Sequence, residues 1–261
     1  MLVPGLTANA HSFDGLLGAG LGDAMHVFAF DARGRGLSDK PDSGYAMADH
    51  AADLLGALDA LGLERVHLGG HSFGGLLTYY VAANHPERVE TAAVLDAPAD
   101  LDLAILDQIA PSLARLERTF GSWEEYDDLV RSFPYWDGFT WNDELHAYYR
   151  GDAEERPDGS IRPRCNPAHI RAVIEGELEI DWPATIERVA CPTLVVRATD
   201  PFGPPGSGPI LTAESAQRAV TRLQDATLAE FRGNHITFIF GCHARDVVEE
   251  IVSFIAAREV A

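Results

Sequence analysis

Residues 68–75, Leu-Gly-Gly-His-Ser-Phe-Gly-Gly, constrain the fold more than any other stretch of the chain. They contain the pattern Gly-x-Ser-x-Gly centred on Ser72, and the glycines allow the backbone to reverse sharply around that serine. Residues 65–68 before the pattern read as a short buried strand, and residues 76–83 after it read as an apolar helix. The stretch therefore predicts a strained strand-to-helix turn that presents Ser72 as a candidate nucleophile. A glycine-rich turn without chemistry is the alternative.

Apolar runs that alternate with helical patterns predict the rest of the architecture. Short buried strands separated by amphipathic helices are typical of a mostly parallel sheet with helices on both faces, an α/β fold. The chain of 261 residues is long enough for one such domain with an inserted subdomain. We expect strands at 1–3, 26–31, 65–68, 91–96, 192–197 and 226–231, and helices at 11–22, 46–61, 76–83, 212–223 and 244–257.

The alternation stops between residues 99 and 189, where no buried strand is evident. Helical patterns occupy 101–120, 123–133, 143–150 and 168–177, and the turn-rich residues 156–160 are expected to close a hairpin or loop. We therefore predict an α/β core formed by residues 1–98 and 190–261. Residues 99–189 are predicted to form a helical cap, or lid, inserted into that core.

Composition narrows the possible partners. The formal net charge is −20, with 40 acidic and 20 basic residues, and such a field repels nucleic acids and anionic membranes. No apolar run is long enough to span a bilayer and no basic leader precedes the first strand, so we expect a soluble, cytoplasmic protein. The three cysteines, Cys165, Cys191 and Cys242, are widely spaced and are expected to be buried or inert. We expect neither a metal site nor a cofactor, and oligomeric state cannot be read from the sequence.

A serine nucleophile needs a base to take its proton and an acid to orient that base. His235 follows the last predicted strand, and Asp200 follows the strand that ends near residue 197. The chain order Ser72, Asp200, His235 is the order expected when an elbow serine is served by an acid and then a histidine. Asp96, at the end of an earlier strand, is the rival acid. We favour Asp200 because the loop around it matches better the setting expected for the acid that orients the histidine.

These features together resemble the α/β-hydrolase superfamily, within the branch of small cap-bearing esterases, lactonases and carbon–carbon bond hydrolases. The resemblance implies that Ser72 is the nucleophile, that His235 acts as general base and then general acid, and that Asp200 orients the imidazole. The matching segments span nearly the whole chain. They are the turn Pro4-Gly5, the loop 31–39, the elbow 70–74, the Asp200 loop and Gly233-Asn234-His235.

The resemblance also implies an oxyanion hole made of two backbone amides, those of Phe73 and Leu6. The sequence departs from the family in the early turn, where Pro4-Gly5 replaces the usual His-Gly pair. Proline lacks an amide hydrogen, but the expected donor lies two residues later. Family members also carry about two strands ahead of this turn, and the sequence begins almost inside it. His71 is expected to point away from the pocket.

The insertion is rich in aromatic residues, some of which we expect to line an apolar pocket over Ser72 while the others form the insertion's own core. This composition predicts a small hydrophobic or aromatic substrate whose ester or lactone is cleaved through an acyl-serine intermediate. Hydrolysis of a carbon–carbon bond in a ring-cleavage product is an alternative, and so is a non-catalytic small-molecule receptor on the same fold. Dehalogenase and epoxide hydrolase chemistry is disfavoured, because relatives with those activities carry an aspartate in place of Ser72. The expected pocket residues are Trp123, Phe133, Tyr135, Trp136, Phe139 and Trp141.

Overall fold

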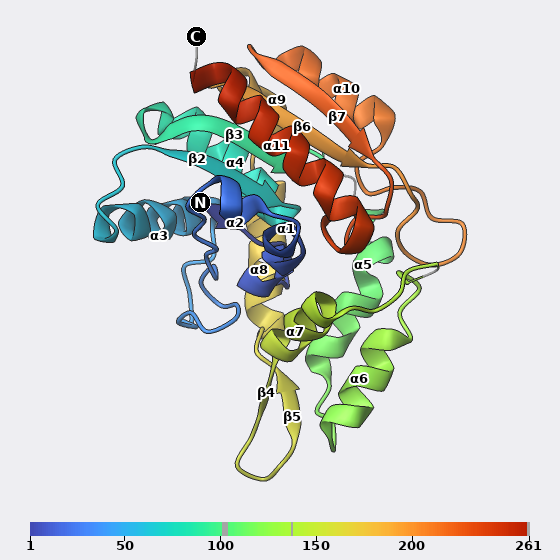
Figure 1. Ribbon diagram of the computed structural model, residues 1–261. Helices are drawn as coiled ribbons and strands as arrows, with labels where there is room; N and C mark the ends of the chain where they lie inside the picture. The colour runs from blue at the N-terminus through green and yellow to red at the C-terminus, as the bar shows by residue number, and fades with distance from the viewer. Residues whose placement is uncertain (101–103, 137, 260–261) are drawn as a thin grey trace.

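The computed structural model describes residues 1–100, 104–136 and 138–259. Its centre is a parallel sheet of five strands in the order β1-β2-β3-β6-β7 (Figure 1). Because the strands are parallel, their carboxyl ends meet at one edge of the sheet, where ligands bind in open α/β folds. The strands are β1 (Leu2–Val3), β2 (Val66–His71), β3 (Val89–Leu95), β6 (Thr193–Ala198) and β7 (Ala226–Phe231).

The strand expected at residues 26–31 is reduced to a single parallel bridge between Leu2 and Ala29. Two hydrogen bonds hold this segment, from Leu2 N to Phe28 O at 2.8 Å and from Phe30 N to Leu2 O at 3.0 Å. The prediction of a full strand was wrong because β1, its neighbour, is only two residues long. Apolar side chains alone do not make a strand where the partner backbone is this short.

Side chains alternate between two apolar layers, one on each face of the sheet. On β6, Val195 faces one layer, while Leu194 and Val196 face the other. The first layer is built with α3 (Met47–Ala60), α4 (Phe73–Asn84), α9 (Trp182–Glu187) and α10 (Ala213–Arg222). The second is built with η1 (Ala10–Phe13), α1 (Asp14–Gly18), α2 (Leu21–Ala24) and α11 (Ala244–Glu259).

Residues 99–189 leave the sheet after β3 and return to it before β6, and we call them the insertion. Most of it lies at the lower end of the molecule in Figure 1. Residues 101–103 of the expected first helix lie outside the described residues, and residues 156–160 close a hairpin as expected, with Gly159 at φ 82°. The insertion contains α5 (Ile105–Ala114), η3 (Arg115–Glu117), α6 (Trp123–Arg131), α7 (Asp143–Asp152), the hairpin of β4 (Ala153–Glu155) and β5 (Ile161–Pro163), and α8 (Pro167–Leu178).

The interior of the insertion is continuous with the sheet core. Its buried aromatics, such as Tyr126 and Tyr149, belong to the same apolar cluster as Phe238 and Phe240 of the C-terminal segment. Its last helix, α9, packs beside α4 in the opposite layer. Residues 182–187 therefore pack as part of the core, although the sequence placed them in the cap.

A buried ion pair lies within the insertion, next to the turn that follows β1. Arg115 and Asp152 are both about 1% exposed, and their side chains meet at 2.6 Å. The Tyr126 hydroxyl donates to the same carboxylate, and Arg115 Nη2 donates to Thr7 O at 3.4 Å. Removing one partner of such a pair leaves an uncompensated buried charge, so the pair stabilises the insertion, and the hydrogen bond to Thr7 O links it to the core.

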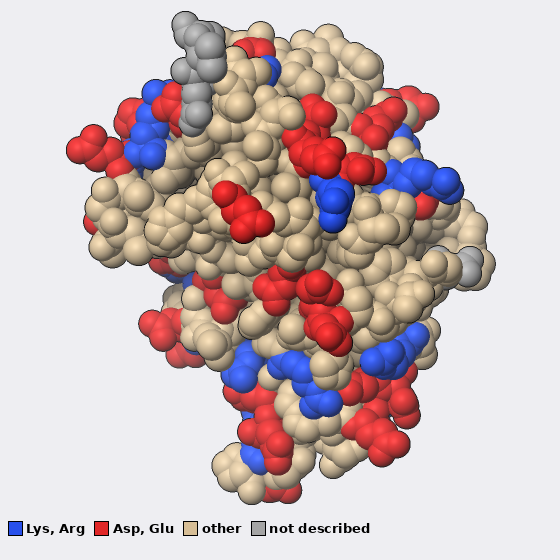
Figure 2. All heavy atoms as spheres, viewed as in Figure 1, with Lys and Arg blue, Asp and Glu red and all other residues tan. Residues whose placement is uncertain are grey.

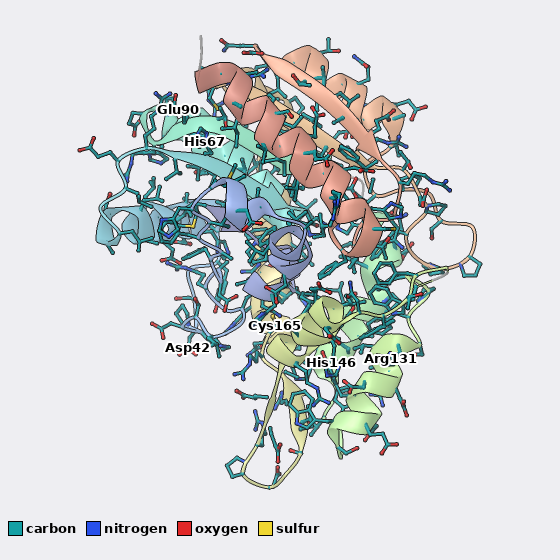
Figure 3. The ribbon with its side chains drawn as sticks, viewed as in Figure 1. Asp42, His67, Glu90, Arg131, His146 and Cys165 are labelled. Atoms are coloured by element: carbon teal, nitrogen blue, oxygen red, sulfur yellow. The ribbon has the colours of Figure 1, made fainter. Side chains whose placement is uncertain are left out.

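Acidic side chains are spread over the visible surface, with basic side chains interspersed among them (Figure 2). Within the described residues, the model has no helix with both the length and the apolar character needed to cross a bilayer. The three cysteines form no disulfide with one another; Cys165 and Cys191 are buried, and Cys242 is exposed. Figure 3 places Cys165 between the insertion and the core, where its Sγ lies 3.7 Å from Thr7 O.

Candidate active site

Ser72 sits on a strained turn between β2 and α4. Its backbone has φ 55° and ψ −119°, a left-handed conformation that side-chain-bearing residues rarely adopt. The neighbouring glycines are required by contact, because a Cβ on Gly70 would collide with the Gly74 carbonyl and one on Gly74 would collide with the Val3 carbonyl. The strained strand-to-helix turn predicted from the sequence is confirmed.

The imidazole of His235 pairs with Asp96. His235 Nδ1 lies 2.7 Å from Asp96 Oδ2, and the Asp96 side chain is fully buried. The other carboxylate oxygen, Oδ1, accepts the Ala198 amide at 3.0 Å. Asp96 itself has φ 50° at the end of β3, so the backbone is bent to direct this carboxylate at the histidine. Both carboxylate oxygens are thereby held, and Nδ1 is fixed as the donor while Nε2 is left available as a base.

Asp200 does not contact His235, so the prediction that it orients the imidazole was wrong. Its Oδ2 accepts the Gly233 amide at 3.0 Å, and its own amide donates to Gly233 O at 3.0 Å. Gly233 has φ 100°, which bends the chain just ahead of the histidine. The Asp200 carboxylate is used by this turn, and it therefore supports the loop that carries His235.

His71 was missed by the sequence reasoning, which placed its side chain away from the pocket. The ring is buried and lines the pocket beside that of His235, with the two centroids 4.5 Å apart. Its Nε2 donates to His235 O at 2.7 Å. Burial lowers the pKa of His71 well below its usual value, and the adjacent His235 acts in the same direction, so the ring stays neutral. The one feature of the sequence that could have indicated a place in the pocket for His71 is its position directly before Ser72.

Phe73 and Leu6, whose amides are the expected oxyanion donors, both line the pocket. Phe73 is the first residue of α4, so its N–H has no acceptor within the helix. Among the described residues, neither amide donates to another group of the protein. Arg35, fully buried in the loop 31–39, donates from Nε to Leu6 O at 2.9 Å and so holds the second donor in place. The loop 31–39 therefore has a structural role at this site.

The pocket over Ser72 has mostly aliphatic walls, with Tyr148 of the insertion among its few aromatic residues, and a volume of about 130 Å³. None of the six aromatic residues predicted to line it does so; they pack within the apolar cluster of the insertion. Tyr135, for example, stacks on Phe202 at 4.1 Å, and it is Phe202 that borders the pocket. The walls are formed by Ile105, Leu106, Ile109 and Leu113 of α5, Ile174 and Leu178 of α8, Leu76 of α4, and Ile210, Ile236, Ile239 and Phe240 of the core.

Among the described residues, no lysine or arginine lines this pocket, and Glu177 is its one carboxyl group. Glu177 is about 9% exposed, and its Oε1 has no hydrogen-bond partner. Burial raises its pKa to about 8, and the charge of Arg35 only partly opposes this shift. The pocket is therefore nearly uncharged at neutral pH.

Comparisons with known proteins agree with the α/β fold described above. Residues 1–241 match the family model described as alpha/beta hydrolase fold. The chain belongs to this family. The resemblance predicted from the elbow, the loops and the chain order is confirmed, and so is the predicted α/β fold class.

Two relatives and one solved structure illustrate the range of the family. This α/β-hydrolase is 31% identical to 2-(acetamidomethylene)succinate hydrolase of Mesorhizobium japonicum over 195 residues, covering 74% of this chain and 67% of that protein. It is 30% identical to the putative carbamate hydrolase RutD of Variovorax paradoxus over 263 residues, covering 97% and 87%. The crystal structure of E-2-(acetamidomethylene)succinate hydrolase matches with a TM-score of 0.80 at 22% identity, covering 98% and 90%.

Proposed function

We propose that this protein is a serine hydrolase that cleaves a carboxylic ester or lactone of a small, uncharged, mainly apolar substrate. One observation carries the proposal: Ser72 on its strained turn, the His235–Asp96 pair and the amides of Phe73 and Leu6 all meet at one apolar pocket. A nucleophile, a base with its orienting acid and an oxyanion site are the parts that acyl transfer to water requires.

The steps follow from these atoms. Ser72 Oγ attacks the substrate carbonyl while His235 Nε2 takes its proton, and the negative charge that forms on the carbonyl oxygen is bound by the two amides. Asp96 remains ionised and holds the imidazolium through Nδ1. His235 then gives the proton to the departing alcohol, which leaves an acyl group on Ser72. A water molecule, deprotonated by the same Nε2, releases the acid and restores the serine.

The lining favours an uncharged substrate. The named substrate of one relative is a succinate derivative, which bears carboxylates that need cationic partners, and this pocket has no lysine or arginine among its described lining residues. The same argument disfavours a carboxylate-bearing ring-cleavage product, and with it the carbon–carbon bond alternative. A volume of about 130 Å³ is close to that of an engineered cavity that holds benzene, so the substrate is small. The insertion acts as the lid that closes over it.

The test is hydrolysis of short-chain 4-nitrophenyl esters by the wild type and by Ser72→Ala. We expect the substitution to lower kcat by at least about 10³-fold while the thermal unfolding midpoint stays close to that of the wild type. Equal hydrolysis by the two proteins would overturn the role of Ser72. A panel of esters, lactones and dienones then ranks the bond types, and a preference for dienones would replace the ester proposal with carbon–carbon hydrolysis.

A further inference from the structure

We propose that Glu177 is a specificity-determining residue that binds an uncharged polar group of the substrate, a hydroxyl or a primary amide, away from the bond that is cleaved. The inference rests on the proposed function for the meaning of the pocket, but it concerns a residue outside the reacting set. Glu177 forms no hydrogen bond with Ser72, His71 or His235, and it projects from the insertion, on α8.

The first observation is that one buried oxygen atom of Glu177 forms no hydrogen bond with the described residues. Glu177 Oε1 is buried and has no partner within the part of the chain that the structure describes. A buried polar atom without a partner costs about 1–3 kcal/mol, so an apolar side chain at this position would be the more stable choice. A ligand that supplies the missing hydrogen bond would recover this free energy on binding.

The second observation is the surrounding wall. The neighbouring lining residues on the same helix, Ile174 and Leu178, are aliphatic, as are Leu76 and Leu113 from α4 and the end of α5. In such surroundings a carboxyl group and its ligand interact without competition from many protein dipoles. The pocket therefore combines one polar anchor with apolar walls, which is the usual composition of a specific small-molecule site.

The charge state selects the kind of polar group. The carboxyl is protonated at neutral pH, and a protonated carboxyl both donates and accepts. A hydroxyl or a primary amide also does both, whereas a carboxylate offers only acceptors and an ammonium only donors. Arg35, whose Nη2 also lacks a partner, lies close enough to act on Glu177 electrostatically, and its positive charge disfavours a cationic ligand.

Ser12 provides the internal control. Its hydroxyl is also buried, belongs to a residue that lines the same pocket, and has no hydrogen-bond partner among residues 1–100, 104–136 and 138–259. It projects from η1 of the core, however, and carries no ionisable group. If any unpaired polar atom in the pocket could bind the polar group of a ligand, Ser12→Ala would change ligand preference as much as a change at Glu177 does.

The experiment measures binding rather than turnover, so that it does not depend on which bond is cleaved. Dissociation constants of benzyl alcohol, ethylbenzene and benzylamine are determined by NMR titration at pH 6.5 for the wild type, Glu177→Gln, Glu177→Leu and Ser12→Ala. We expect the wild type to bind benzyl alcohol about tenfold tighter than ethylbenzene, the size of one good hydrogen bond. Glu177→Gln keeps a donor and an acceptor and should retain this ratio. Glu177→Leu should bring it to one or below.

Unchanged ratios in Glu177→Leu, or an equal loss in Ser12→Ala, would overturn the proposal, and tighter binding of benzylamine than of benzyl alcohol would overturn its uncharged part. The proposed function fails on a different result, the absence of ester hydrolysis that depends on Ser72. The two failures are therefore distinguishable. Circular dichroism of each variant shows whether it is folded before its binding is compared.

Discussion

The loops that follow β3 and β6 each carry an aspartate at the carboxyl edge of the sheet, but they use it differently. Asp96, after β3, is fully buried and divides its two oxygens between the His235 ring and the Ala198 amide. Asp200, after β6, has one oxygen on the Gly233 amide. Asp96 positions the imidazole of His235, and Asp200 positions the backbone of the turn that precedes His235. Position at a strand end therefore does not decide which acid serves the histidine.

The largest expected effect is that of Asp96→Asn. An asparagine that keeps its oxygen on the Ala198 amide must present its NH₂ group to His235 Nδ1, which forces the ring proton onto Nε2 and blocks the base. We expect kcat for 4-nitrophenyl acetate to fall on the order of 10⁴-fold, with little change in KM. Steady-state kinetics measures this, and a fall of less than about tenfold would remove Asp96 from the mechanism.

The same substitution at the other acid should do much less. Asp200→Asn keeps an oxygen acceptor for the Gly233 amide, so kcat should stay within about threefold of the wild type. Asp200→Ala removes the acceptor, and we expect about a tenfold loss of kcat and about 1–2 kcal/mol of stability as the loop loosens. Kinetics and urea unfolding separate the two variants. A loss for Asp200→Asn as large as that for Asp96→Asn would erase the distinction between the loops.

A smaller effect is expected for His71→Phe, which tests a third support of the same histidine. Phenylalanine preserves a ring beside His235 but cannot donate to its carbonyl. We expect kcat to fall about fivefold to tenfold, because the loop is held less rigidly while the His235–Asp96 pair remains. The check is kcat together with the unfolding free energy. If neither kcat nor the unfolding free energy changed, the hydrogen bond of 2.7 Å between His71 Nε2 and His235 O would contribute nothing to catalysis or to stability.

Glu177 lies in neither loop, and its titration should affect the stability of the fold in addition to the ligand preference proposed for it. The folded pKa of Glu177 is raised to about 8 from an ordinary value of 4.5, so its protonated form contributes stability below pH 4.5 that is lost as pH rises to about 8. We expect the wild type to lose stability over this range relative to Glu177→Gln, by at most about 1.4 kcal/mol for each step of one in pH. Urea unfolding at pH 5 and 9 checks the sign; a parallel pH dependence would contradict it.

Much of this arrangement could be read from local sequence. The Gly-x-Ser-x-Gly pattern is itself local, although only Gly70 is excluded from bearing a side chain by a residue within the pattern, and Gly74 is required by the distant Val3 carbonyl. The histidine is placed by the strand before it. The orienting acid could not be chosen this way, because the choice depends on the φ of 50° at Asp96 and on a loop 139 residues away. The predicted pocket wall was wrong for a similar reason. Of the aromatics of the insertion, Tyr148 lines the pocket, but the six predicted for it pack in the insertion's own apolar cluster. Which face of a helix meets a distant pocket is decided by packing that composition does not reveal.

The most direct test of the central claim, that Asp96 and not Asp200 orients the catalytic histidine, is the proton NMR signal of the His235 Nδ1–H. A proton held in a short hydrogen bond to a buried carboxylate resonates far downfield and needs no substrate to be observed. We predict that this signal is present in the wild type and in Asp200→Asn, and that it disappears in Asp96→Asn. Its persistence in Asp96→Asn together with its loss in Asp200→Asn would contradict the account.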